Sequence, residues 1–175
     1  MTSKPLLSLI LLSSNGDFML ALGIDPGTAI CGFGFVENLR GELRPINYGV
    51  ITTSPQAFMQ DRLLKIFSEL DALISNFKPN VIAVEKLFFG KNSTTAITVA
   101  QARGVVLLTA ARHNLDLIEI TPNEVKQSVT GYGGADKQQV IYMVTKILNL
   151  AEPPTPDDAA DALAIAVAAC HSFRS

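Results

Sequence analysis

Two carboxylates of the sequence stand where apolar segments end. Asp25 closes the run MLALGID and Glu85 closes the run NVIAVE, and each run is typical of a buried strand. If the two strands are parallel neighbours, both side chains emerge at the edge where the strands end, which is where ligands tend to bind. Either acid taken alone is better explained as the polar end of a strand that meets water.

Two further carboxylates, Asp158 and Asp161, lie near the start of a helix that we predict over residues 156–172. The pattern Thr-Pro-Asp-Asp at 155–158 matches a capping box with the threonine at the N-cap, and capping alone would explain Asp158. It does not explain Asp161, because every other residue from 159 to 170 is apolar and an apolar helix is buried. Carboxylates three residues apart on one helical face repel each other unless a cation compensates.

The four acids together have the ligand chemistry of a magnesium site. No histidine or cysteine of the chain accompanies them. Oxygen-only ligands suit Mg²⁺ or Mn²⁺ rather than zinc. Two such ions about 3.5–4 Å apart activate a water molecule and stabilise the leaving oxygen of a phosphodiester. The set therefore predicts a metal-dependent nuclease or phosphotransferase that holds two Mg²⁺ ions in its site.

The elements that must position these acids can be predicted from hydrophobic periodicity and turn residues. Strands are predicted at 19–25, 30–38, 43–53, 80–85 and 115–120, and helices at 56–77, 93–113, 121–129, 136–150 and 156–172. Three strands come first, and the later strands alternate with helices. This order predicts an α/β fold, a mixed five-stranded sheet flanked by helices on both faces.

The composition is that of one globular domain. Of the 175 residues, 48% are hydrophobic and 17% are charged, and no apolar run reaches the roughly 18–20 residues of a membrane span. We place the domain at residues 19–175 and treat residues 1–18 as a non-core N-terminal extension, because no signal-peptide cleavage pattern follows them. The two cysteines fit buried thiols of a reducing compartment, which predicts a cytoplasmic protein.

Five segments of the chain share their residues and their order with one known family. They are GIDPGTAICGFG (23–34), VEKLFFGKN (84–92), AQARGV (100–105), VKQSVTGYG (125–133) and DDAADALAIA (157–166). They closely resemble the RuvC family of bacterial Holliday-junction resolvases. The resemblance implies an RNase H-like fold and a homodimer that resolves four-way DNA junctions in homologous recombination and DNA repair. It also implies paired symmetric nicks in strands of like polarity, 5′-phosphate products, and the RuvA–RuvB branch-migration complex as a partner.

The resemblance also assigns the metal ligands. It places the acidic tetrad of the family, which is both catalytic and metal-binding, on Asp25, Glu85, Asp158 and Asp161. It leaves Asp157 as an adjacent acid outside the tetrad, where its charge favours the helix dipole.

The predicted DNA contacts come from three places in the chain. By resemblance, Phe88 stacks on an unpaired base at the junction, and Lys126 and Lys137 bind DNA. From the residues alone, the aromatic pair that begins at Phe88, with Lys91 nearby, offers base stacking beside phosphate contacts. The same aromatic side chains could instead fill the core just after the strand.

Small residues follow one another at near-helical spacing in the predicted helix 93–113. They are Ala96, Ala100, Gly104 and Ala111. A helix with such a stripe can pack closely against a two-fold partner. Burial of the stripe against the sheet explains it equally well.

Two other functions stay open at this level. GIDPGT also resembles the phosphate loop of the actin/Hsp70 superfamily, which would make the chain a phosphate-binding ATPase. Such enzymes need two domains around the nucleotide, and 175 residues are too few. The chain could also be a non-catalytic junction-binding protein with purely structural carboxylates, but the presence of all four acids favours a nuclease.

Overall fold

The computed structural model describes residues 18–86 and 93–172. The strands are β1 (Phe18–Asp25), β2 (Ile30–Leu39), β3 (Glu42–Thr52), β4 (Val81–Glu85) and β5 (Asp116–Ile120). The helices are α1 (Met59–Phe77), α2 (Ser93–Arg112), α3 (Pro122–Thr130), α4 (Lys137–Ile147) and α5 (Asp157–Ser172). These ten elements follow the predicted order. β1 begins one residue before the predicted start of the domain, and the predicted extension otherwise lies outside the described residues.

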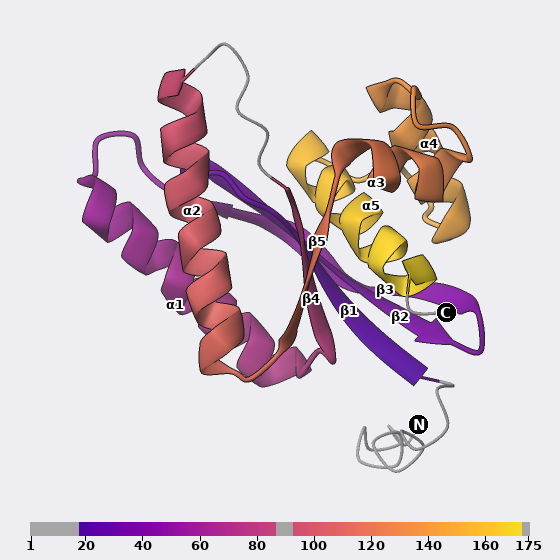
Figure 1. The fold of residues 1–175 in the computed structure, drawn as a ribbon, viewed down its shortest axis with the longest axis horizontal. Coiled ribbons are helices and arrows are strands. Elements are labelled where there is room, and N and C mark those ends of the chain that lie inside the picture. The colour runs from indigo at the N-terminus through magenta and orange to yellow at the C-terminus, as the bar shows by residue number, and fades with distance from the viewer. Residues whose placement is uncertain (1–17, 87–92, 173–175) are drawn as a thin grey trace.

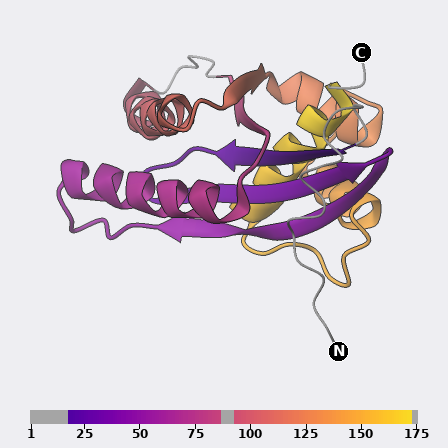
Figure 2. The ribbon, with the colours of Figure 1, turned by 90° about the horizontal axis from the view of Figure 1, so that it is seen from below.

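The strands form one mixed sheet in the order β3-β2-β1-β4-β5 (Figure 1). β1 pairs antiparallel with β2, and β2 pairs antiparallel with β3. β4 lies parallel to β1, and β5 lies parallel to β4. The predicted mixed five-stranded sheet is therefore confirmed. Figure 2 shows that helices cover both of its faces, as expected.

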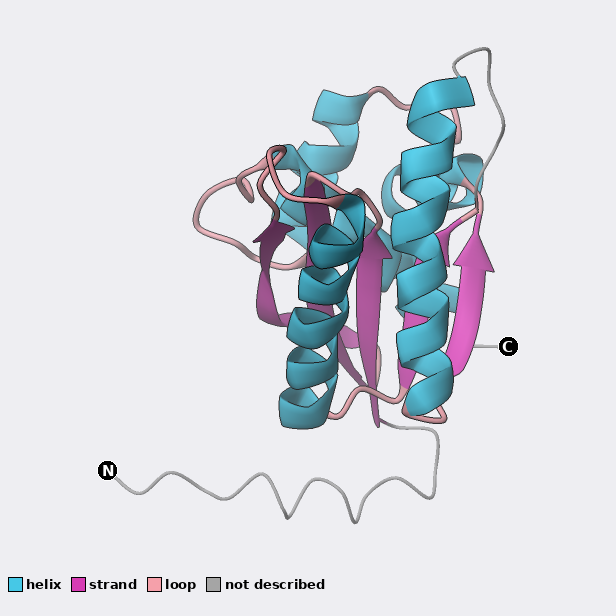
Figure 3. Ribbon diagram, turned by 90° about the vertical axis from the view of Figure 1, so that its left-hand side faces the viewer, coloured by secondary structure: helices cyan, strands magenta, loops and turns pink. Residues whose placement is uncertain are grey.

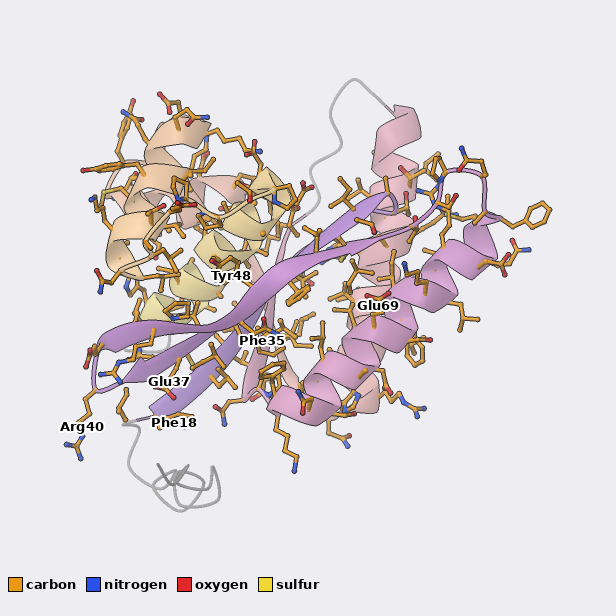
Figure 4. The ribbon with its side chains drawn as sticks, turned by 180° about the vertical axis from the view of Figure 1, so that it is seen from behind. Phe18, Phe35, Glu37, Arg40, Tyr48 and Glu69 are labelled. Atoms are coloured by element: carbon orange, nitrogen blue, oxygen red, sulfur yellow. The ribbon has the colours of Figure 1, made fainter. Side chains whose placement is uncertain are left out.

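Each face of the sheet has its own hydrophobic core. α1 and α2 cover one face, and they lie in front of the strands in Figure 3; α3, α4 and α5 cover the other. Successive residues of β1 point to opposite faces, so Leu22 belongs to the core under α1 and α2 and Ala21 to the core under α5. Phe35 of β2 is fully buried on the α1 side, with its ring centroid 4.7 Å from that of Phe77 (Figure 4).

α5 lies directly on the sheet because the strands beneath it carry glycines. A Cβ built on Gly23 of β1 would overlap the carbonyl oxygen of Ala162, and one on Gly32 of β2 would overlap the carbonyl oxygen of Asp158. A Cβ on Gly34 would lie 2.9 Å from the side chain of Leu163. The three glycines therefore leave room for the helix backbone itself, and we refer to Gly23, Gly32 and Gly34 as the glycine seat.

One helix start has a capping box, and another lacks the capping box that the sequence predicts. The sequence Thr-Pro-Asn-Glu at 121–124 forms a capping box: Thr121 Oγ1 accepts a 3.2 Å hydrogen bond from Glu124 N, and Glu124 Oε2 accepts one of 2.7 Å from Thr121 N. The capping box predicted at 155–158 is wrong. α5 begins at Asp157, one residue later than a capping box with Thr155 at the N-cap requires. Asp158 therefore is not the third residue of the helix, and capping does not explain it.

Two further features concern the cysteines and the search for membrane-spanning helices. Cys31 and Cys170 are buried, as expected, and they belong to the cores on opposite faces of the sheet. Within the described ranges 18–86 and 93–172, no helix has the length and apolar character needed to cross a membrane.

We expect Gly23→Ala to destabilise the protein strongly. The new Cβ would lie 2.5 Å from Ala166 N, a backbone atom that no rotamer change can move away. The free energy of unfolding, measured by urea denaturation, should fall by about 3 kcal/mol, as for a severely overpacked core. Gly133→Ala is the matched control, because its Cβ would meet only ordinary contacts at 3.5 Å or more. Equal losses in the two variants would contradict the role given to the glycine seat.

Candidate active site

β1 and β4 bring two of the predicted acids to one edge of the sheet. The strands are parallel neighbours, and Ile24 is paired with Val84 in their register. Asp25 and Glu85 are the next residues and end their strands, so they leave the sheet side by side. Both side chains are half-buried. The parallel pairing on which the sequence argument depended is therefore present.

α5 adds the two remaining acids to the same edge. The carbonyl of Asp158 lies against Gly32, which is the cross-strand partner of Asp25. The first turn of α5 is therefore held over the end of β1. Asp161 follows in the next turn and is half-buried, whereas every other residue from 159 to 170 is buried. The expected buried apolar helix around Asp161 is confirmed.

A pocket of about 220 Å³ opens between the strand ends and the three helices of this face. Its charged lining residues are Asp25, Glu85, Asp161, Lys126 and Lys137. Pro122, Val125, Val140, Ala164 and Ile165 complete the lining. The structure thus brings three of the four predicted metal ligands and two of the predicted DNA-binding lysines to one pocket. The fourth acid, Asp158, does not line the pocket, but its charge acts on Asp25.

A larger groove of about 450 Å³ lies along α4 and the segment before it. Tyr132 and Tyr142 line it, and Asp136 is its acidic residue. Asp136 is the N-cap of α4, where its Oδ1 accepts a 2.9 Å hydrogen bond from Gln139 N. The groove therefore lacks the cluster of acids that marks the smaller pocket.

Burial and mutual repulsion raise the pKa values of three acids at the pocket. Burial raises the pKa of Asp25 to about 7, together with repulsion from Asp161, Glu85 and Asp158. Burial also raises the pKa of Glu85 and the pKa of Asp161. The charge of Lys126 opposes the rise at Glu85, and Lys137 opposes the rise at Asp161. The lysines therefore neutralise the pocket only in part.

Lys137 makes a contact that the sequence did not reveal. Its Nζ lies 3.1 Å from Asp161 Oδ2 and 3.2 Å from Asp157 Oδ2. Asp157 is in the first turn of α5, as expected, but it also binds a lysine of the pocket. The signal that could have found it is spacing, because Asp157 and Asp161 are four residues apart and share a helix face. Phe88 and Lys91, the other predicted DNA contacts, lie outside the described residues.

The pocket matches a divalent cation in charge and donor type. Among residues 18–86 and 93–172, no three acidic, histidine or cysteine side chains converge as a ready-made metal cage. The acids at the pocket supply only oxygen donors, which suit Mg²⁺ or Mn²⁺. Burial and then repulsion between the acids raise the pKa of Asp25, and a bound dication would relieve that repulsion. The residues therefore fit such an ion.

Comparison with known proteins assigns the family. The family model described as crossover junction endodeoxyribonuclease RuvC matches residues 21–171. The chain belongs to the RuvC family. RuvC proteins from Syntrophomonas wolfei and Desulfitobacterium hafniense strain DCB-2 are 52% and 53% identical to it over 156 residues. Each match covers 89% of this chain, and 91% and 94% of the respective relative.

A solved RuvC structure shares the whole architecture. Thermus thermophilus RuvC in complex with a Holliday junction substrate is 36% identical, with a TM-score of 0.83 over 89% of this chain and 95% of that one. The yeast mitochondrial Holliday junction resolvase Ydc2 is 18% identical with a TM-score of 0.63, a likeness of fold alone, over 87% of this chain and 79% of that one. RuvC membership confirms the resemblance carried by the five segments, the RNase H-like fold and the endodeoxyribonuclease class.

The raised pKa of Asp25 predicts how stability depends on pH without metal. Between pH 3.8 and about 7 the folded protein keeps a proton on Asp25 that the unfolded chain releases. The free energy of unfolding in EDTA should therefore fall as the pH rises from 5 to 8, by on the order of 3 kcal/mol. Asp25→Asn should reduce this fall and make the protein more stable than wild type at pH 8. Urea denaturation of the wild type and of Asp25→Asn at pH 5 and pH 8 measures both free energies of unfolding.

Asp116→Asn is the control for this measurement. Asp116 is an exposed acid at the start of β5, away from the strand ends that form the pocket. It should show the pH dependence of the wild type. If Asp25→Asn and Asp116→Asn behave alike, the burial and repulsion described at Asp25 do not govern its proton.

Proposed function

We propose that this RuvC protein is a structure-selective endonuclease that resolves four-way DNA junctions by paired, symmetric nicks in strands of like polarity. We place it in homologous recombination and DNA repair in the cytoplasm, with the RuvA–RuvB branch-migration complex as a partner. Residues 19–175 would act as one nuclease domain. The observation that carries the proposal is that Asp25, Glu85, Asp161 and Lys126, all from the RuvC-like segments, meet Lys137 at one pocket.

The proposed site uses the four carboxylates as metal ligands. Asp25, Glu85, Asp158 and Asp161 would hold two Mg²⁺ ions, and Mn²⁺, which takes the same oxygen ligands, would substitute. When bound, the ions supply an activated water and stabilise the leaving oxygen of the phosphodiester. The protein contributes the fixed placement of the acids, because two end parallel strands and two lie on a helix packed against the glycine seat. The expected products carry a 5′-phosphate and a 3′-hydroxyl.

The proposed DNA contacts surround these acids. Lys126 and Lys137 line the pocket, so their charges can attract the phosphates that the carboxylates repel. Phe88 and Lys91 follow Glu85 by three and six residues. We propose base stacking by Phe88 and a phosphate contact by Lys91, as the sequence predicts.

The proposed homodimer would use the outer face of α2. Ile97 and Leu108 are 59% and 62% exposed, and Gly104 and Ala111 lie exposed on the same face. A Cβ on Gly104 would meet nothing within 4 Å, so this residue is not buried against the sheet. The inward face of α2 is separate, with Val106 in the core. An apolar stripe with a glycine at its centre suits close packing against a second copy.

Asp161→Asn should abolish nicking while junction binding survives. Asparagine keeps the size of the side chain but removes the charge needed to hold a dication. The rate of nicking of a synthetic four-way junction in Mg²⁺ should fall by at least about 100-fold, as expected when a member of a catalytic set is lost. Asp61→Asn, which changes an exposed acid in the first turn of α1, is the control.

The same assay separates the other functions considered. Unchanged nicking by Asp161→Asn would sink the assignment of the site. Wild-type protein that binds the junction without nicking it would be a junction-binding module. Hydrolysis of ATP without nicking would indicate a phosphate-binding ATPase.

Leu108→Glu should convert the dimer into a monomer. A carboxylate within the apolar pairing surface would be buried without a partner. Analytical ultracentrifugation should show the change in mass, and paired nicks should give way to single, uncoordinated ones. Tyr142→Glu is the matched control, because Tyr142 is 60% exposed on α4, a helix of the opposite face. A wild-type protein that is monomeric at assay concentration would contradict the proposed pairing.

A further inference from the structure

The ammonium group of Lys137 lies between two carboxylates on one face of α5. Its Nζ is 3.1 Å from Asp161 Oδ2 and 3.2 Å from Asp157 Oδ2. Asp161 belongs to the proposed metal site, whereas Asp157 does not. The contact with Asp157 is therefore one that the proposed metal chemistry does not use.

The fold determines both ends of this contact. Lys137 is the first residue of α4, and the capping box of Asp136 and Gln139 fixes the start of that helix. The start of a helix is an unfavourable place for a positive charge, so the two acids of α5 compensate it. Asp157 and Asp161 can do so together because residues four apart face the same side of a helix.

The side chains of Asp157, Lys137 and Asp161 differ in their exposure to solvent. Asp157 is 59% exposed and Lys137 is 49% exposed, whereas Asp161 is 35% exposed and lines the pocket. An exposed ammonium group can exchange a carboxylate for a phosphate at little cost, because ion pairs in contact with water are weak. Lys137 is thus placed to leave α5 when a phosphate approaches the pocket.

We propose that Asp157 is a positioning residue that holds Lys137 at the carboxylates until junction DNA draws the lysine to a phosphate. The inference rests on the proposed function. In the protein without DNA, the ammonium group neutralises part of the charge of Asp161. When DNA binds, Lys137 moves to the phosphate and Asp161 becomes available to a metal ion. Asp157 therefore opposes DNA binding through one of the two ion pairs of Lys137 that must break.

A double-mutant cycle on junction binding tests this role. Binding of a fluorescent four-way junction is measured by anisotropy in EDTA at one fixed, low salt concentration. Asp157→Asn should tighten binding about two- to fivefold, the equivalent of one partly exposed ion pair. In a Lys137→Gln background the same substitution should leave the affinity unchanged, because the residue that Asp157 holds is gone.

Two controls accompany the cycle. Asp157→Glu keeps the charge and should bind like the wild type. Glu152→Gln removes an exposed acid five residues earlier and reports the effect of losing one negative charge. Thermal unfolding midpoints close to that of the wild type verify that the variants are folded.

The outcomes separate this inference from the proposed function. Equal tightening by Asp157→Asn in both backgrounds would overturn the inference, because general repulsion of DNA would then be the cause. An unchanged affinity in the wild-type background would overturn it too, and nicking by the wild type would leave the proposed function standing. Wild-type protein that does not bind the junction would overturn the proposed function, and the inference with it.

Discussion

The height of α5 above the sheet is the constraint on which the site depends. Gly23, Gly32 and Gly34 place no Cβ between sheet and helix, so the backbone of α5 meets the strands directly. Any side chain there would lift the helix and carry its two acids away from Asp25. Because the contact is made largely by backbone atoms, the spacing does not depend on which rotamers the core adopts. The chemistry of the pocket thus begins with three residues that have no side chain.

Holding these acids together is unfavourable by itself, and the rest of α5 supplies the compensation. The raised pKa values of Asp25, Glu85 and Asp161 show that the charged forms are disfavoured where they stand. Lys126 and Lys137 offset the repulsion only in part. From residue 159 to 170 the helix is otherwise buried, and the burial of that apolar surface is favourable. Hydrophobic packing therefore keeps in place charged groups that would otherwise separate.

Periodicity was sufficient to predict the elements, since the strands and helices are strongly patterned, and their order predicted the mixed sheet. The approach of Asp25 to Glu85 required an assumption of parallel pairing, which no local pattern contains. The cap expected at residues 155–158 failed because a cap depends on the residue at which a helix begins, and patterns locate helix ends less sharply than helices. The ion pair of Lys137 with Asp157 joins two helices whose relative position only tertiary packing decides.

The sheet separates two layers that have different tasks. The pocket is lined by strand ends and by α3, α4 and α5, while α1 and α2 cover the opposite face. If two copies pair through α2 as proposed, the pairing surface and the pocket lie on opposite faces of the sheet in each copy. The distance between the two cuts then spans the sheet and the α2 helix of both copies, which are packed elements of regular structure. Selectivity for a junction would then be a matter of stiffness, because only DNA whose two scissile bonds match that span can occupy both pockets at once.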